Sequence, residues 1–181
     1  IDIGSTKRTI DVRTEADKAV IKLGTLAAEI FNGNQNAVIN IPAVPGANSY
    51  TMEMPAEALA SGGSSLTVNT VLGSINIPSG MLSTMKDIGG KTLGITIAAV
   101  DRSTLPAVVR AAIGNRPVLR LTLTLDGVET TWSNPDSPVR ASIPYAPTSA
   151  ELESPESIII LYIDASGNII TIPNGIYDEH A

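Results

Sequence analysis

The sequence predicts an α+β fold, mainly antiparallel β and sandwich-like, with one N-terminal helix. Three observations support this prediction: a recurring strand-and-proline tetrapeptide, several further apolar segments of strand length, and one segment whose apolar residues have helical spacing. The chain has 181 residues, the usual size of one domain or of two small ones. We therefore expect one module over residues 1–181, with a helix and strands to about residue 85 and an all-β portion over about 88–181.

The N-terminal helix is expected at about residues 15–32. Thr14 can cap it, with Asp17 at the third helical position. Gly33 follows as a left-handed terminator. Gly24 inside the segment costs about 1 kcal/mol relative to alanine, so tertiary packing must hold the helix. The apolar residues that recur on one helical face are Ala19, Val20, Leu23, Leu26, Ala27, Ile30 and Phe31.

A tetrapeptide with apolar residues at its first and third positions and proline at its fourth recurs along the chain. Its apolar–polar–apolar order is the period-two pattern of a half-buried strand. Proline has no N–H to extend the hydrogen-bond ladder, so each copy predicts a strand that ends at its proline or meets a sheet edge there. The copies are Ile39–Pro42, Met52–Pro55, Ile75–Pro78 and Ile170–Pro173, with a degenerate fifth at Ala141–Pro144.

Four further segments predict strands, at residues 66–70, 93–97, 118–125 and 158–163. Turn sequences at 126–127 and 164–168 predict hairpins, and residues 106–113 predict a helical turn that Gly114 closes. The residues expected in the core are Val20, Leu23, Ile30, Ile39, Ile41, Ile75, Ile77, Ile95, Ile97, Leu121, Leu123, Ile159, Leu161 and Ile172.

Composition argues against several classes of function. Cysteine is absent and His180 is the single histidine, so the chain has no thiol nucleophile and nothing from which to build a His-based triad or a multi-His zinc site. The longest apolar run, Ile158–Ile163, has six residues, about a third of what a membrane-spanning helix needs. We therefore expect no enzyme activity, no cofactor, no metal and no membrane insertion.

The distribution of charge argues against nucleic acid as a partner. The formal net charge is −6, and residues 1–140 hold all 12 Lys and Arg against 12 Asp and Glu. The last 41 residues have no basic residue and therefore supply the whole net charge. Binding to phosphate needs clustered positive charge, which this pattern does not offer. The acidic end is expected to be a solvated surface, with carboxylates that collect calcium as the alternative.

A few segments resemble chemical motifs. Residues 164–168 carry oxygen ligands on alternate positions, like the start of a calcium loop, but a hairpin turn explains them better. Residues 61–65 are rich in glycine and serine but lack the lysine and the following helix of a phosphate loop. The pairs Asp126 with Glu129 and Glu151 with Glu153 could be proposed as catalytic carboxylates, yet two neighbouring acids are expected by chance. We expect none of these to be catalytic.

Stacking on a sugar ring needs exposed aromatic faces. The chain has six aromatic residues, and Phe31 and Tyr162 are expected in the core. The candidate ligand-binding residues are therefore Trp132, Tyr145 and Tyr177, provided that they are exposed and coplanar.

The strand-and-turn pattern resembles a β-rich module of large Firmicutes cell-surface proteins that also carry S-layer homology (SLH) repeats. The resemblance spans roughly residues 10–180. In that family the module continues into a further strand and SLH repeats, so the chain, which stops at Ala181, is expected to be truncated at its C-terminal end. The matching segments are Val38–Pro42, Met54–Leu59, Leu66–Pro78, Leu93–Ile97, Val139–Tyr145, Tyr162–Asn168 and Ile176–Asp178.

The resemblance implies a non-catalytic, extracellular structural or spacer module of an S-layer-associated, wall-bound surface protein of a Gram-positive cell. Its partners would be other modules of the same protein. The chain begins at Ile1 without Met or a signal peptide, so we expect a processed or excised piece. The alternative function is a carbohydrate-binding module for cell-wall or environmental polysaccharide.

Overall fold

The structure is a computed structural model that describes residues 2–3, 6–7, 9–32, 36–60, 62–164 and 166–178. The chain divides into two compact units. Unit 1 comprises Ile1–Ala99 and Leu119–Ile143, and unit 2 comprises Val100–Val118 and Pro144–Ala181. The chain therefore passes between the units at three places.

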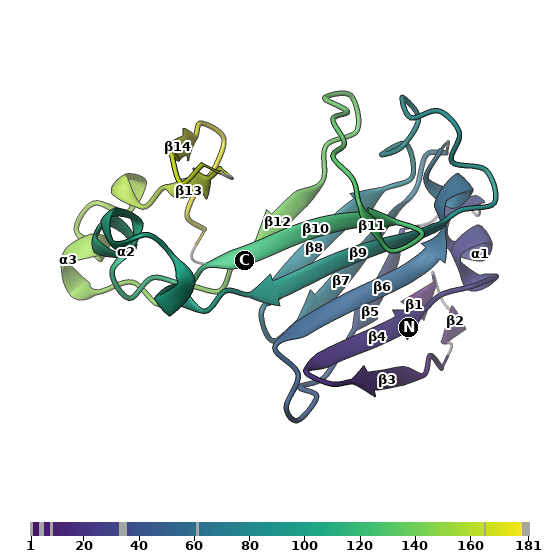
Figure 1. The fold of residues 1–181 in the computed structure, drawn as a ribbon, viewed down its shortest axis with the longest axis horizontal. Coiled ribbons are helices and arrows are strands. Elements are labelled where there is room, and N and C mark those ends of the chain that lie inside the picture. Colours follow the sequence, from purple (N-terminus) through teal and green to yellow (C-terminus); the bar gives the residue numbers. More distant parts are fainter. Residues whose placement is uncertain are drawn as a thin grey trace. The chain divides into compact units, whose positions relative to one another are not determined.

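Unit 1 is a sandwich of two six-stranded sheets, which Figure 1 shows as two layers. Sheet A contains, in order across the sheet, β12 (Arg140–Ser142), β8 (Gly73–Pro78), β7 (Ser65–Thr70), β5 (Ala37–Asn40), β1 (Asp2–Ile3) and β2 (Thr6–Lys7). Sheet B contains, in order, β11 (Val128–Glu129), β10 (Leu119–Leu125), β9 (Thr92–Ala99), β6 (Ser49–Pro55), β4 (Lys18–Lys22) and β3 (Val12–Glu15).

Most neighbouring strands are antiparallel, and the described exceptions are the parallel pairs β4–β6 and β5–β7. Both arise because the chain changes sheet at each step from β4 to β7, going from sheet B to A, back to B and again to A. Parallel neighbours need such a crossover connection, because a tight hairpin joins only antiparallel strands. The predicted α+β fold with mainly antiparallel, sandwich-like sheets is confirmed.

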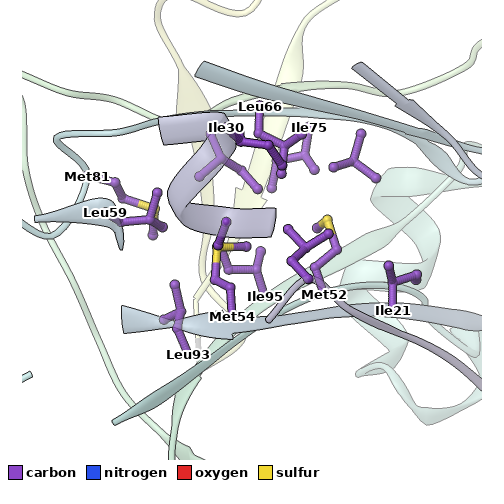
Figure 2. Close-up of a cluster of buried hydrophobic side chains, with 14 of the residues drawn as sticks. Ile21, Ile30, Met52, Met54, Leu59, Leu66, Ile75, Met81, Leu93 and Ile95 are labelled. Carbon is purple, nitrogen blue, oxygen red and sulfur yellow. The ribbon is translucent and has the colours of Figure 1, made fainter. Parts of the chain in front are cut away.

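One continuous core fills the space between the sheets. Figure 2 shows Leu66 and Ile75 on the side of sheet A, with Met52, Met54 and Ile95 on the side of sheet B. Helix α1 (Leu26–Asn32) buries Ala27, Ile30 and Phe31 in this core and lies against β7 and the 3-10 helix η1 (Ala56–Leu59). The buried side chains alternate along the strands, as a half-buried sheet requires.

The predicted helix over residues 15–32 is wrong in its first half. Thr14 lies in β3, a turn follows in which Ala16 has φ 55°, and β4 then runs from Lys18 to Lys22. Ala19, Val20 and Ile21 are all buried, so this strand, which pairs with β3 and β6, is buried on both of its faces. Gly24 has φ 50° and turns the chain before α1 begins. The predicted terminator, Gly33, lies outside the described residues.

The five proline tetrapeptides do mark strand ends, as predicted. β6 and β8 end at Pro55 and Pro78, whereas β5 and β12 end two residues before their prolines and β14 (Ile169–Ile172) ends directly before Pro173. η1 follows Pro55 at once, since a residue without N–H suits the start of a helical turn.

Unit 2 is built from short elements. They are η2 (Arg102–Thr104), α2 (Ala107–Ile113), α3 (Ser149–Leu152), η3 (Pro155–Ser157) and the antiparallel pair β13 (Ile160–Ile163) and β14. α2 coincides with the predicted helical turn, and its cap is Gly114 with φ 56°. No described helix of either unit has the length and apolar character to cross a membrane.

The predicted core is correct for all but one of its residues in unit 1 and wrong in unit 2. Ten of the predicted residues are buried: Val20, Leu23, Ile30, Ile39, Ile41, Ile75, Ile77, Ile95, Ile97 and Leu123. Ile159 is 50% exposed, and Leu161 and Ile172 are only half-buried, because β13 and β14 pair with each other in a sheet of two strands. Leu121, near the start of β10, is also exposed. Alternating apolar and polar residues predict a strand, but its apolar face is buried only where a second layer packs on it.

Candidate functional site

Trp132, the first candidate for stacking on sugar, is half-buried and packs against the core of unit 1. It follows β11 in a loop that Asn134 fastens. The buried Asn134 donates from Nδ2 to the carbonyl oxygen of Gly80 at 2.8 Å and to Ser83 Oγ at 3.0 Å. The Trp132 ring therefore belongs to a loop anchored on the core.

Tyr145, the second candidate, is half-buried in unit 2 and donates its hydroxyl to Glu151 Oε1 at 2.7 Å. Arg116 Nη2 lies 2.8 Å from the same oxygen. The other oxygen, Oε2, accepts from the backbone N–H and the hydroxyl of Thr148, both at 2.9 Å. Thr148 and Glu151 thus form a capping box at the start of α3, and Glu151 ties it to the segment that carries Arg116.

These hydrogen bonds shift the ionisation of the group. The N–H of Thr148, followed by the Tyr145 hydroxyl, lowers the pKa of Glu151 to about 2. The hydrogen bond to Glu151 raises the pKa of Tyr145, and it raises that of Arg116 as well. A carboxylate held ionised by donors is suited to structure, not to proton transfer near neutral pH.

Tyr177, the third candidate, is half-buried and follows β14 in unit 2. The three candidates thus come from two units, Trp132 from unit 1 and the two tyrosines from unit 2. Tyr162, expected in the core, is instead 54% exposed on β13. The sequence missed this exposure because an apolar strand looks the same whether one or both of its faces are covered.

Within the segment between β13 and β14, the described residues 164 and 166–168 make the contacts of a hairpin turn, which the sequence favoured over a calcium loop. Asp164 Oδ1 accepts from the backbone N–H groups of Ser166 and Asn168, and Oδ2 accepts from Asn168 Nδ2, each at 2.8 Å. The Asn168 amide, above all, lowers the pKa of Asp164. Both carboxylate oxygens serve the turn itself.

The remaining motif candidates also have local structural contacts. Asp126 Oδ1 accepts from the N–H of Thr92 at 2.9 Å, and Glu129 lies 3.5 Å from Arg120. In the glycine–serine segment, Ser64 is buried and donates its hydroxyl to the carbonyl of Phe31, which holds this turn on α1. The described residues contain no group of three or more His, Cys, Asp or Glu that could hold a metal. His180, Glu179 and Ser61 lie outside the described residues.

The outer face of sheet A is a feature that the sequence analysis missed. Its strands alternate, so that Leu66, Val68, Ile75 and Ile77 point into the core and the residues between them point outward. We call the uncharged polar members of the outward set the amide–hydroxyl face, which comprises Asn40, Ser65, Thr67, Asn69, Ser74, Asn76 and Ser142. The polar middle positions of three tetrapeptides, on β5, β8 and β12, all belong to it. These polar positions were the feature of the sequence from which the face could have been predicted.

The strand register arranges this face in rows. Ser142, Ser74, Asn69 and Asn40 lie opposite one another across four strands, and Arg140, Asn76, Thr67 and Val38 form the next row. The outer face of sheet B differs, because it carries the ion pairs Lys22–Glu53 at 3.1 Å and Arg120–Glu129 at 3.5 Å.

A shallow depression of about 270 Å³ lies elsewhere in unit 1. Its lining mixes charges of both signs, and the ammonium group of Lys22 is already 3.1 Å from Glu53. The residues that line it are Thr9, Ile10, Asp11, Arg13, Lys22 and Leu26.

Fold and surface together define unit 1 as a β-sandwich with two interleaved, mixed sheets and one face rich in amides and hydroxyls. Comparisons of the chain with models of protein families, with characterised proteins and with solved structures found no match. The resemblance to a module of SLH-bearing surface proteins therefore stays a prediction.

Proposed function

We propose that the chain is a non-catalytic structural or spacer module of an extracellular, S-layer-associated surface protein. The observation that supports it best is the interleaved sandwich of unit 1. Four successive strands, β4 to β7, alternate between the sheets, so three successive chain connections would resist separation of the two sheets. A spacer needs this property, because it must keep its length while the flanking modules move.

The core strengthens the interleaved arrangement. Phe31, Leu66 and Met81 are completely buried, and Tyr50 and Met52 are 1% exposed. Burying one such side chain contributes about 1.5–3 kcal/mol relative to leaving it in water. The two layers thus share one core, so that opening of an inner strand such as β6 or β9 would expose apolar side chains to water.

The charged and polar groups of the other candidates support the same proposal. The Glu151 carboxylate caps α3, and the Asp164 carboxylate closes a hairpin. Partners on this proposal are the other modules of the same surface protein, and the anchoring to the wall polymer is carried by SLH repeats outside this sequence.

Placement between an anchor and a reporter tests the spacer role. The chain is inserted between an SLH anchor and an epitope on a Gram-positive cell, with an unrelated rigid sandwich of similar length as the control. We expect equal antibody access for both fusions. Retention of the epitope on the wall by this chain without the SLH anchor would contradict the proposal, since the chain would then be an anchor itself.

A turnover assay tests the absence of catalysis. The purified chain is incubated with polysaccharides, and new reducing ends are measured. We expect none above the rate with heat-denatured protein. Release that Asp126→Asn or Glu129→Gln abolishes would overturn the proposal and identify a carboxylate-dependent glycosidase.

A further inference from the structure

We propose that the amide–hydroxyl face of sheet A binds a neutral, hydroxyl-rich polysaccharide. This binding goes beyond the spacer role and uses residues other than Trp132, Tyr145 and Tyr177. The ligand class follows from the chemistry of the face. Amides and hydroxyls both donate and accept hydrogen bonds, and so do the hydroxyls of a sugar.

The charge of the face selects a neutral ligand. β5, β7, β8 and β12 carry no Asp or Glu, and Arg140 is the one charged residue among them. On the neighbouring strands β1 and β2, the register continues the row of Arg140 with Asp2 and Lys7, whose charges are opposite. A neutral sugar can approach such a surface without stripping water from a carboxylate, which is costly. On the four strands that carry the amides and hydroxyls, an anionic polymer would find Arg140 as the one cation, which is too little for strong ionic attraction.

Hydrogen bonds within the face hold its side chains ready. Asn69 Nδ2 donates to Asn40 Oδ1 at 2.7 Å. Asn76 Nδ2 donates to Ser65 Oγ at 3.1 Å and to Thr67 Oγ1 at 3.0 Å. Ser65 Oγ in turn donates to Asn36 Oδ1 at 3.0 Å. A ligand therefore meets side chains that have already lost much of their rotational freedom, which lowers the entropic cost of binding.

This internal network still leaves groups for a ligand. Within the described part of the chain, the bonds above engage both Nδ2 hydrogens of Asn76 but not its Oδ1, and they engage Oδ1 of Asn40 but not its Nδ2. The face thus offers a ligand both a donor, Asn40 Nδ2, and an acceptor, Asn76 Oδ1. Asn40 and Ser142, at the two ends of one row, are exposed.

The regular rows favour a polymer over a single sugar. Neighbouring strands lie about 4.8 Å apart, so polar groups recur at that spacing across β12, β8, β7 and β5. A polysaccharide repeats its hydroxyls and can engage several rows at once, whereas a monosaccharide meets only one. Linked contacts raise the overall affinity without any new kind of contact.

Affinity electrophoresis tests the proposal with defined probes. The gels contain hydroxyethyl cellulose, soluble starch, laminarin or yeast mannan, and polygalacturonate is the anionic comparison. We expect retardation by at least one neutral polymer, little change between low and high salt, and no competition by the corresponding monosaccharide at equal mass. Retardation by polygalacturonate alone, lost at high salt, would overturn the proposal.

Variants locate the binding surface. Asn69→Ala with Asn76→Ala removes two amides, and since each neutral hydrogen bond is worth about 2- to 12-fold in Kd, we expect binding to weaken about 5- to 150-fold. Thr122→Ala, a half-buried threonine on the outer face of sheet B, is the matched control and should bind as the unchanged protein does.

Two further results distinguish loss of the binding surface from loss of folding. Asn40→Ala with Ser142→Ala changes only exposed residues, so its melting temperature should match that of the unchanged protein while its binding weakens. Retardation that survives both double variants but is lost in Trp132→Ala would overturn the proposal in favour of stacking. No retardation by any neutral polymer would also overturn it, yet it would leave the spacer role, which the display experiment measures separately.

Discussion

Each of the two units is stabilised internally by a different kind of contact. Unit 1 buries large apolar side chains from both sheets and from α1 in one continuous core. In the described part of unit 2, the buried hydrophobic residues are Val109 and Ile113, and the polar network around Glu151 links its segments. Hydrophobic burial scales with area and spans many strands, whereas a few hydrogen bonds stabilise only the turns that they join. Unit 2 should therefore open before unit 1 does.

The largest effect is expected from Phe31→Ala, which empties a fully buried site between the layers of unit 1. We expect the free energy of unfolding to fall by about 3–5 kcal/mol, from lost burial and from the cavity left behind. Urea denaturation of the purified chain measures it. The control is Val108→Ala in unit 2, 78% exposed, which should change stability by less than about 0.5 kcal/mol.

Asn134→Ala tests whether a polar contact can matter as much inside the core of unit 1. The substitution leaves the carbonyl of Gly80 without the donor 2.8 Å away. We expect a loss of about 1–3 kcal/mol, because two hydrogen bonds of the buried Asn134 amide, each worth about 0.5–1.5 kcal/mol, are lost, while the Ser83 N–H still donates to the Gly80 carbonyl at 3.0 Å. Equal stability of this variant and the unchanged chain in urea would show that water replaces the amide.

Ile113→Val probes the small apolar cluster of unit 2. Removing one methylene from this 5% exposed side chain should cost about 0.5–1.5 kcal/mol. The comparison between units predicts that the cost appears locally. Hydrogen exchange should accelerate over residues 100–118 and stay unchanged in β6 and β9. Uniform acceleration across both units would contradict their independence.

The smallest effect is expected from acid acting on Glu151. Its pKa of about 2 in the folded chain lies below the ordinary value of 4.5, so its contribution to stability is complete above about pH 4.5 and is lost as the pH falls through about 2. Proteolysis within unit 2 should therefore increase over that window. Glu151→Gln should show the faster cleavage already at pH 6, whereas Glu153→Gln, at an exposed neighbour, should behave as the unchanged chain does.

Local chemistry made the strands of this protein predictable. Proline cannot extend a ladder, so the strand ends near Pro42, Pro55, Pro78, Pro144 and Pro173 followed from the sequence. The short helix α2 was predictable as well. Glycine adopts the positive φ of a helix end at little cost, and Gly114 caps α2 with φ 56°. These features depend on residues that lie within one or two turns of each other.

Residues 15–24 show where such reasoning fails. The apolar positions Ala19, Val20 and Leu23 fit a helical face, yet Val20 and Ile21 are β-branched and lie in a strand. The parallel pairing with β6, about 30 residues further on, selected the strand. Sequence periodicity cannot distinguish a helix face from a strand that is covered on both sides.

The sequence alone determined that this chain forms a β-rich sandwich whose strands end at prolines, because turn chemistry and alternation act over a few residues. Only the tertiary structure decided which strands share a sheet. That decision brought Asn40, Asn76 and Ser142 together on one outer face and placed Glu53, from an equivalent tetrapeptide, on the other sheet. It also left Tyr162 exposed in a two-stranded hairpin. The physical reason is that sheet membership depends on pairing between distant segments. That pairing is stabilised by the burial of the whole core rather than by any single stretch of chain.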